Sequence, residues 1–591
     1  MKRFGRPGGR NGAVRWFGGN SGNAEGERSE SPGAWMQYTL PCMRWNSWRL
    51  WAAAVVAAGL LELPFPLAGP MPPWRSVFAW FGLAPLLWAM LTPECAEGPK
   101  PLRRSFLLAY ACGVLWYAGN CYWIRDTMMR YGDMPPLAPV LLLAGFSLVL
   151  GLYFGLFGLG VALVRRATGS TGKALVAAPV LWAAAELAAA RITSVPWDQL
   201  GYSQVDNGLV NQLAPWTGVY GISFVLVGVN ALLVGGLLRN GTRGRWTAGG
   251  AGLALLAAGW AGVLWPVPKA ATTATAMLIQ PNLDVGVDDT WKGSAWDEHM
   301  AAFTQLAEDE CKPFLKGIPQ TGASRGELDC KALPAHPTLV AWPESPAPFV
   351  QADPRFLKSM GTIARTLDAP LVVGGVGMDY SEDDQSWHDF NSAMVVGADG
   401  VLVGRYDKIH LVPFGEYVPF QNLLFFARKL TGRVSSFDRG QERKVFRLNG
   451  HRYGVFICYE AVFADEVRQF SRLGAEVLVN ISDDGWYGDT SAPWQHLNMA
   501  RMRAVENRRW ILRDTNNGVT AAIDPYGRVR QSISRHQVGA LPAEFGFRDD
   551  VTFYTEHGDV FAWLCAILAL GIVGWAFRAG LRSVISNKVR S

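Results

Sequence analysis

Three residues on separate segments of the chain could together carry out acyl chemistry. They are Glu344 in VAWPESPAPF, Lys408 in GRYDKIHLVPFGEYVPF and Cys458 in GVFICYEAVF. A thiol can accept an acyl group as a thioester once a base removes its proton, and a carboxylate can be that base. A positioned ammonium can lower the thiol pKa and stabilise a tetrahedral oxyanion. The trio therefore predicts nucleophilic catalysis, provided that the fold brings the three segments together.

Each member of the trio ends or follows a run that is typical of a strand. Glu344 follows TLVAW and a proline, Lys408 closes the segment RYDK, and Cys458 ends YGVFIC. Side chains at the ends of different strands can converge at one edge of a sheet. Taken singly, they could also be a surface acid, a solvated cation and a buried inert thiol. The polar residues that follow the cysteine in CYE favour a sharp turn that presents the thiol.

The region from residue 273 onward predicts a layered α/β domain. Runs rich in β-branched residues, such as TATAMLIQPN, APLVVGGVGM and AEVLVNIS, alternate with helical patterns near 293–309, 354–367, 462–473 and 493–507. The turn signals GADG and DPYG indicate hairpins, so the sheet cannot be purely parallel. We expect a mixed sheet covered by helices.

The composition of the whole chain is too apolar for a soluble protein of this length. Half of its 591 residues are hydrophobic and only 18% are charged. Runs long enough to cross a hydrocarbon core of roughly 30 Å lie near 49–67, 76–92, 105–124, 137–164, 174–190, 209–238, 247–266 and 559–577. We therefore predict a membrane α-helical bundle of about eight spans.

Lys and Arg residues cluster between alternate spans, which indicates the cytoplasmic side. Clusters precede the first span, separate the second from the third, the fourth from the fifth and the sixth from the seventh, and follow the last. If the spans alternate, both termini are cytoplasmic and the α/β domain is extracytoplasmic. We expect no nucleic-acid partner, because the net charge of +6 is spread over these clusters and not gathered on one face.

These patterns divide the chain into four parts. Residues 1–45 are expected to be a disordered cytoplasmic extension, since they are rich in Gly, Arg and Ser. Residues 46–267 are expected to form the transmembrane bundle and 268–558 the extracytoplasmic catalytic domain. Residues 559–591 are expected to form the last transmembrane helix and a cytoplasmic tail.

Five motifs resemble the apolipoprotein N-acyltransferase family of the nitrilase superfamily. They are PWDQLGYSQ, WPES, RYDKIHLVPFGEYVPF, ICYE and NISDDGWYGDTSAPWQHLNMARMRAVENRRWILRDTNNGVTA. The resemblance runs from residue 45 to 577 and implies a nitrilase-like αββα sandwich joined to the membrane bundle. It also implies that Glu344 is the general base, Cys458 the nucleophile and Lys408 the cation that supports the base and the oxyanion.

The same resemblance implies supporting and substrate-binding residues. Glu416 matches a second glutamate that positions the lysine or shares its proton. Tyr459 and Glu460 match residues beside the nucleophile, although both could be ordinary polar turn residues. Trp291 and Trp296 compete to match a substrate-binding tryptophan, and the run WDE favours Trp296. Either tryptophan could instead be a membrane-facing aromatic without a chemical role.

The resemblance further implies a two-step transfer. A phospholipid, in the family usually phosphatidylethanolamine, acylates Cys458 and leaves as a lysophospholipid. The α-amino group of a diacylglyceryl-cysteine at the N-terminus of an apolipoprotein then attacks the thioester. The implied partners are this phospholipid donor, this lipoprotein acceptor and membrane lipid. We expect a monomer without a cofactor in the bacterial inner (cytoplasmic) membrane, with the catalytic domain on the periplasmic side.

Several smaller features complete the expectations. No metal site is predicted, because His410 and His496 lack Cys or His partners at suitable spacing. Cys311 and Cys330 flank an insertion and could form a disulfide in an oxidising compartment. The apolar loop at 418–430 is expected to guide acyl chains, with core packing as the alternative. PWDQLGYSQ is expected in an extracytoplasmic loop, where it could meet lipid head groups or simply join two helices.

Two rival interpretations use part of this evidence. A membrane-anchored amide or nitrile hydrolase would share the trio but would not explain PWDQLGYSQ or the multiple spans. A non-catalytic lipid-binding or transport protein would explain the spans but not the trio. The ionisable residues within spans are few, and Glu62 and Glu186 form no evident relay, which argues against a pump or an ion channel.

Overall fold

The structure, a computed structural model, describes residues 48–132, 134–238, 241–283, 285, 294–309, 337–345, 349–383, 385–417 and 437–590. The helices and sheets all belong to one unit, Trp48–Ser591. The expected disordered extension, the Cys311–Cys330 disulfide and the acyl-guiding loop at 418–430 lie outside the described residues. These three expectations therefore stay predictions.

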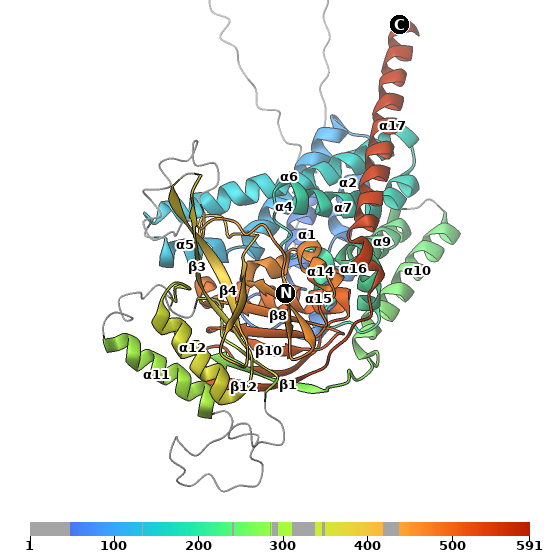
Figure 1. The fold of residues 1–591 in the computed structure, drawn as a ribbon. Coiled ribbons are helices and arrows are strands. Elements are labelled where there is room, and N and C mark those ends of the chain that lie inside the picture. Colours follow the sequence, from blue (N-terminus) through green and yellow to red (C-terminus); the bar gives the residue numbers. More distant parts are fainter. Residues whose placement is uncertain are drawn as a thin grey trace, which may run out of the picture. The chain divides into compact units, whose positions relative to one another are not determined.

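The N-terminal half of the described chain is helical (Figure 1). Its long helices are α1 (Trp48–Glu62), α2 (Ala84–Leu91), α4 (Pro101–Asn120), α5 (Trp123–Tyr131), α6 (Leu137–Thr168), α7 (Thr171–Ile192), α9 (Val219–Leu238) and α10 (Thr242–Ala261). Shorter turns of helix join them: η2 (Pro73–Trp80), α3 (Pro93–Ala96), η3 (Leu200–Gln204), η4 (Val210–Leu213), α8 (Ala214–Thr217) and η5 (Gly262–Leu264). The C-terminal helix α17 (Val560–Arg590) returns to pack against α6 and α7.

Small residues let the central helices of the bundle approach closely. A side chain added at Gly155 of α6 would come within 2.7 Å of the Phe106 ring of α4, and one added at Gly158 would come within 2.6 Å of Ala109. Such glycines permit tight van der Waals packing, which is the main attraction between helices in lipid. The opposite face of α6 exposes large apolar side chains, including Leu156.

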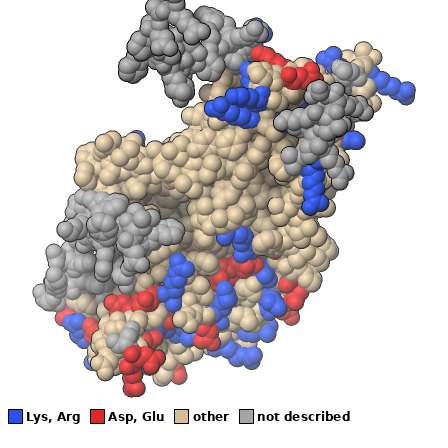
Figure 2. Space-filling view, turned by 90° about the horizontal axis from the view of Figure 1, so that it is seen from above, with Lys and Arg blue, Asp and Glu red and all other residues tan. Residues whose placement is uncertain are grey.

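Six helical segments of the described chain are long and apolar enough to cross a membrane by length and composition. They are Pro73–Leu91, Leu137–Thr168, Thr171–Ile192, Val219–Leu238, Thr242–Leu264 and Val560–Gly580. Helices α1 and α4 overlap the other two predicted runs, but α1 has only 15 residues and α4 begins with Arg103 and Arg104. Figure 2 shows a broad uncharged band with charged side chains gathered on either side of it. The membrane-spanning character is confirmed, and the number of eight spans stays a prediction.

Two six-stranded sheets form the rest of the molecule, in the orders β12-β1-β2-β3-β4-β5 and β11-β10-β9-β8-β7-β6. The first sheet contains β1 (Ala274–Gln280), β2 (Leu339–Ala341), β3 (Leu371–Ser381), β4 (Ser386–Val396), β5 (Leu402–Asp407) and β12 (Gly539–Phe545). The second contains β6 (Val445–Leu448), β7 (His451–Ile457), β8 (Val477–Ser482), β9 (Ile511–Thr515), β10 (Thr520–Ile523) and β11 (Val529–Ile533). Strands β1, β2 and β3 of the first sheet run parallel, and so do β7, β8 and β9 of the second. The other neighbouring pairs are antiparallel, and the hairpins β4–β5 and β10–β11 close at the predicted GADG and DPYG turns.

Helices cover the outer face of each sheet, so the domain has four layers. The first sheet is covered by α11 (Ser294–Asp309) and α12 (Pro354–Leu367), and the second by α14 (Ala464–Arg472) and α15 (Ala492–Asn507). The domain has one core between the two sheets and another between the first sheet and its outer helices. Successive residues of β1 point to different cores, because Leu278 packs between the sheets and Ile279 packs under the outer helices. Residues of α15 also join the core of the helical bundle. The predicted mixed-sheet αββα sandwich is confirmed.

Candidate active site

Cys458 stands at a sharp turn between strand β7 and the short helix η9 (Cys458–Val462). Its φ of +47° lies in the left-handed region, which residues with a side chain rarely adopt. A strained strand-to-helix turn is a known way to hold a nucleophile and present its side chain. The turn that the motif CYE predicts is therefore present.

The carboxylate of Glu460 holds this turn in place from within the core. Its Oε2 accepts the backbone N–H of Ile457 at 2.8 Å. Its Oε1 accepts the Tyr406 hydroxyl at 2.8 Å and the backbone N–H of Ile409 at 2.7 Å. Glu460 is fully buried and links the end of β7 to the segment that carries Lys408. This connection fixes the two segments relative to each other.

Lys408, directly after β5, lies buried between two carboxylates. Its side chain is 1% exposed, and Nζ donates to Oε1 of Glu344 and to Oε1 of Glu416, each at 2.9 Å. A buried ammonium is costly unless it is paired. Burial opposes the charge, but the two carboxylates raise the pKa of Lys408 well above its ordinary value. Lys408 is therefore a fixed positive charge, and the solvated-cation alternative is wrong.

Glu344 follows β2 and is held through both carboxylate oxygens. Oε2 accepts the backbone N–H of Asp483 at 3.0 Å, whereas Oε1 accepts Lys408 and also the side-chain amide of Asn391 at 2.7 Å. Asn391 donates to Glu416 as well, at 2.5 Å. Asn391 lies within β4 in the run FNSAMVV, where no local signal predicts a role in the site. Only the fold reveals it.

The electrostatic environment of the Cys458 thiol keeps it protonated at rest. Burial raises the pKa of Cys458 well above its ordinary value, and the Glu344 carboxylate raises it further. The Lys408 charge and a hydrogen bond with Ser482 oppose this rise. The structure thus brings the charges of Glu344 and Lys408 to bear on the same sulfur. A neutral thiol with an ionised acceptor beside it can lose its proton as it attacks.

A buried network behind the nucleophile holds its backbone. His496 Nε2 lies 2.9 Å from the carbonyl oxygen of Cys458, and Nδ1 lies 3.0 Å from Asp484 Oδ1 and 3.1 Å from Arg513. A carbonyl only accepts, so Nε2 carries the proton. Burial and the Arg513 charge lower the pKa of His496, which favours the neutral ring. His496 thus supports the strained turn and is no isolated histidine.

The motif PWDQLGYSQ forms the junction between the bundle and this network. Trp197 donates to Gln495 Oε1 at 2.9 Å, and its ring stacks on His496 with 6.4 Å between the ring centroids. Tyr202 accepts a hydrogen bond from Arg503 at 2.8 Å. The motif is buried, so it does more than join two helices, and it carries contacts between the two parts of the chain.

The remaining expected site residues make no hydrogen bond to the carboxylate cluster among the described residues, or they lie outside the described chain. Tyr459 packs in the core of the helical bundle and against Phe463, with 5.2 Å between the ring centroids. Trp296, on the outer helix α11, is buried in the core between that helix and the first sheet, with the Arg355 guanidinium 4.8 Å from its ring centroid. Trp291 lies outside the described residues. A substrate-binding role for either tryptophan stays a prediction.

A buried Glu–Lys–Cys site on a four-layer sandwich, joined to apolar helices, defines a membrane-embedded protein with a catalytic domain of the carbon-nitrogen hydrolase type. Residues 331–544 match the carbon-nitrogen hydrolase family, and residues 57–232 match the apolipoprotein N-acyltransferase N-terminal domain. The chain belongs to the apolipoprotein N-acyltransferase family. An apolipoprotein N-acyltransferase of Geobacter metallireducens is 34% identical over 536 residues, which are 89% of this chain and 95% of that protein.

Two further comparisons concern one relative in sequence and one solved structure. An apolipoprotein N-acyltransferase of Pseudomonas aeruginosa is 33% identical over 554 residues, which are 90% of this chain and 97% of that protein. Among solved structures, Saccharomyces cerevisiae Nit3, a member of branch 10 of the nitrilase superfamily, is 17% identical with a TM-score of 0.32. This match covers 47% of this chain and 92% of that one. Within the described residues, no group of three His, Cys, Asp or Glu side chains is placed to hold a metal ion.

Proposed function

We propose that this chain transfers an acyl chain from a phospholipid, through a thioester on Cys458, to the N-terminal α-amino group of a diacylglyceryl-cysteine apolipoprotein. The product is a triacylated lipoprotein. The observation that carries the proposal is the buried pairing of Lys408 with Glu344 and Glu416 beside the strained turn of Cys458. Membership of the family supplies the substrates.

In the first step, the Glu344 carboxylate takes the thiol proton as the Cys458 sulfur attacks the ester carbonyl of the phospholipid. The negative charge that develops on the carbonyl oxygen is stabilised by the Lys408 ammonium and by backbone N–H groups at the start of η9. The carbon–oxygen bond of the ester then breaks, and the proton held by Glu344 passes to the leaving oxygen. A lysophospholipid departs and the acyl chain remains as a thioester.

In the second step, the neutral α-amine of the acceptor attacks the thioester carbon. Glu344 takes a proton from the attacking nitrogen, and the same ammonium stabilises the second oxyanion. The carbon–sulfur bond breaks and the proton returns to the Cys458 sulfur. The amide forms and the free thiol is restored.

The supporting residues have proposed roles of their own. Glu416 shares the Lys408 ammonium with Glu344 and so keeps it at a fixed position. Glu460 holds the turn of Cys458 through the Ile457 N–H. Tyr459, packed against the bundle core, would face the acyl chain of the thioester. Trp296 and Trp291 remain candidates for substrate contact.

Joining this domain to a membrane bundle suits lipid substrates. Moving an acyl chain into water costs roughly 0.8 kcal/mol for each CH₂ group, so the chain must stay in hydrocarbon while the ester reaches the thiol. We place the protein in the inner membrane with residues 268–558 on the periplasmic side, 46–267 and 559–591 in and around the bilayer, and 1–45 in the cytoplasm. A monomer is proposed because one chain supplies every member of the site.

The test uses a phospholipid with a labelled acyl chain and mass spectrometry of the peptide that contains Cys458. Acyl label on Cys458 that is chased onto the amine of a lipopeptide supports the transferase. Label released only as fatty acid would favour a hydrolase, and no covalent label would favour a lipid-binding protein. Cys458→Ser should remove the thioester, whereas Cys565→Ser, a buried cysteine of α17, is the matched control.

A further inference from the structure

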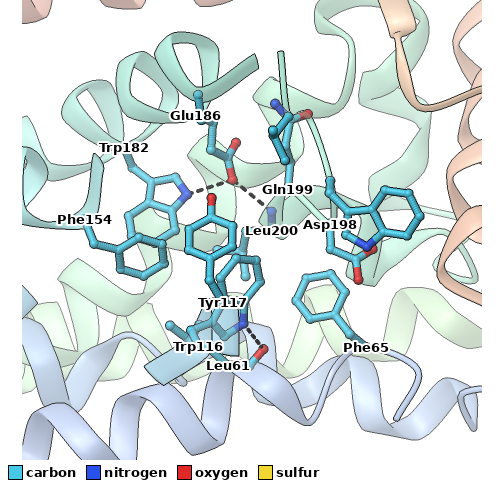
Figure 3. A pocket seen from close by; sticks show the side chains of 13 residues that line it. Leu61, Phe65, Trp116, Tyr117, Phe154, Trp182, Glu186, Asp198, Gln199 and Leu200 are labelled. Carbon is cyan, nitrogen blue, oxygen red and sulfur yellow. Dashed lines mark hydrogen bonds between the residues drawn. The ribbon is translucent and has the colours of Figure 1, made fainter. Parts of the chain in front are cut away.

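A small cavity inside the helical bundle is lined by aromatic rings and two carboxyl groups (Figure 3). Its volume is about 30 Å³. The rings are those of Phe65, Trp116, Tyr117, Phe154, Trp182 and Trp197, and the carboxyl groups are those of Glu186 and Asp198. A space of this size holds one small polar group or a water molecule. The proposed chemistry at Cys458 does not use it.

The carboxyl groups at this cavity have oxygens without hydrogen-bond donors. Glu186 Oε1 accepts the Trp182 indole at 2.9 Å and the backbone N–H of Leu200 at 2.8 Å. Among the described residues its Oε2 accepts no hydrogen bond of ordinary geometry, and the Ser223 hydroxyl is the protein donor beside this carboxyl group. Asp198 is 1% exposed, and within the described chain neither of its oxygens accepts a hydrogen bond of ordinary geometry. Ser223 and Asn120 are the protein's donors here, and they leave acceptor oxygens without a hydrogen bond of ordinary geometry. Dry, poorly paired acceptors are costly, so the cavity is suited to a further donor from a ligand.

A third carboxyl group adjoins the cavity from helix α1. Glu62 follows the lining residue Leu61, and in the described structure neither Glu62 oxygen accepts a hydrogen bond of ordinary geometry. The side-chain amide of Asn120 lies beside both Glu62 and Asp198, and its Nδ2 is also without a partner of ordinary geometry. The cluster thus offers several acceptor oxygens within a small volume.

Aromatic faces together with carboxylates favour one class of ligand. The negative face of an indole or phenyl ring attracts an organic cation, most strongly where water is excluded. A primary ammonium carries three N–H donors, and Glu186 Oε2 and the two Asp198 oxygens are the acceptors available. A hydrated metal ion would need oxygen ligands on most sides, which rings cannot supply. A small organic ammonium fits both the lining and the size.

We propose that this cavity binds the primary ammonium group of a lipid substrate, with Asp198 and Glu186 as its hydrogen-bond acceptors. The assignment deepens the proposed function and rests on it. Trp197 lines the cavity and stacks on His496, whose Nε2 contacts the carbonyl of Cys458. A bound ammonium is thus separated from the backbone of the nucleophile by two stacked rings, those of Trp197 and His496. That separation favours the ethanolamine head group of a donor, because the amine of the acceptor must itself reach the thioester.

The experiment compares two phospholipids with the same acyl chains in the full-length protein in nanodiscs. One is phosphatidylethanolamine and the other is phosphatidylglycerol, which has no ammonium. Asp198→Asn should lower kcat/KM for thioester formation from phosphatidylethanolamine at least about tenfold and leave the value for phosphatidylglycerol unchanged. Asp126→Asn, which changes a more exposed carboxylate on α5, is the matched control and should change neither.

The possible outcomes distinguish an ammonium group of the phospholipid donor from one of the lipopeptide acceptor. They also distinguish a failure of the ammonium site from a failure of the proposed function. A higher KM for the acceptor lipopeptide alone would assign the cavity to the acceptor's α-ammonium. Equal loss with both phospholipids, or no change with any substrate, would overturn the ammonium site. Failure of the unaltered protein to form any thioester would instead refute the proposed function.

A binding measurement covers the case in which Asp198→Asn does not fold. Native mass spectrometry of the Cys458→Ser protein should retain phosphatidylethanolamine at least about tenfold better than its N-acetylated derivative, which lacks the ammonium. Glu186→Gln should remove that preference. Equal retention of the two lipids by Cys458→Ser protein would overturn the proposal without any need for the Asp198 variant.

Discussion

Asn391 and Lys408 donate hydrogen bonds to the same two carboxylate oxygens. Lys408 Nζ lies 2.9 Å from Oε1 of both Glu344 and Glu416, and Asn391 Nδ2 lies 2.7 Å and 2.5 Å from the same two atoms. Two carboxylates this close together repel each other unless donors lie between them. The Asn391 amide is thus a second donor beside the Lys408 ammonium, and it holds the Glu344 carboxylate in its orientation.

This relationship predicts that Asn391 is required for thioester formation. Asn391→Leu removes one donor of the pair, and we expect a loss in kcat on the order of 10² with little change in KM. Asn391→Asp adds a third carboxylate to the cluster and should be worse, because one of the three must take a proton. Pre-steady-state acylation of Cys458 measures both. Activity of Asn391→Asp at or above that of Asn391→Leu would show that charge is not what the amide controls.

The second prediction concerns the pKa of the Cys458 thiol, which the two neighbouring charges should shift in opposite directions. Since the Glu344 carboxylate raises the pKa of Cys458, Glu344→Gln should lower the pH at which the thiol ionises. Lys408→Met should raise it, because the ammonium acts in the opposite direction. The pH profile of Cys458 alkylation by iodoacetamide, followed by peptide mass spectrometry, measures the shift.

Both variants should fail in acyl transfer, which separates ionisation from catalysis. Glu344→Gln would have a thiol that alkylates faster than the unaltered protein at a given pH and yet no base to assist its attack on an ester. A shift of the alkylation profile to higher pH in Glu344→Gln would contradict the proposed charges.

His496 is predicted to act on the rate through the backbone of Cys458. Its Nε2 holds the carbonyl of a residue whose φ is +47°, and such strain costs on the order of 1–3 kcal/mol. His496→Leu should therefore reduce kcat by about tenfold or more while KM stays the same. His496→Gln, which keeps an N–H donor, should recover part of the rate. Equal losses in the two variants would indicate a packing role only.

The sequence predicts the trio because each member ends a strand-like run beside a distinctive motif. Strand ends can be recognised locally, and the hairpin signals GADG and DPYG exclude a purely parallel sheet. Asn391 could not be predicted in this way, since it lies in the middle of β4 and not at the end of a strand-like run. Its role depends on the pairing of β4 with β3 and β5, which places it between two glutamates from other segments.

The cavity in the bundle illustrates the same limit in the membrane part. Glu186 lies in a predicted span and Asp198 lies in the loop PWDQLGYSQ, and the sequence alone does not place them together. The fold brings Asp198 beside Glu186 because η3 begins directly against α7, with the Leu200 N–H on the Glu186 carboxylate. Periodicity locates the helices, but it does not give the turn that buries this loop. The sequence therefore identifies the polar residues of a membrane bundle, but it does not predict which of them contact each other.

The last prediction concerns Asp483 and the dependence of stability on pH. Burial raises the pKa of Asp483 to about 8, although its side chain accepts the Gly485 N–H at 2.9 Å and the Asn516 amide at 3.2 Å. An aspartate in the unfolded chain has a pKa of about 3.9. Between these two values the folded protein keeps a proton that the unfolded chain has released. The contribution of this group to the free energy of unfolding is thus complete below about pH 4 and is lost as pH rises toward 8.

The asparagine of Asp483→Asn cannot titrate, so the variant should not show this fall in the free energy of unfolding as pH rises. Relative to the unaltered protein, the variant should gain stability with rising pH by at most about 1.4 kcal/mol for each pH unit between pH 5 and 8. Thermal unfolding in nanodiscs at pH 5, 6.5 and 8 measures the difference, with Asp549→Asn at an exposed position as the control. A gap between Asp483→Asn and the unaltered protein that stays constant over this range, or that narrows as pH rises, would mean that Asp483 is ionised in the folded state. Its carboxylate would then add a negative charge beside Glu344, and the positive charge of Lys408 would have to balance three carboxylates instead of two.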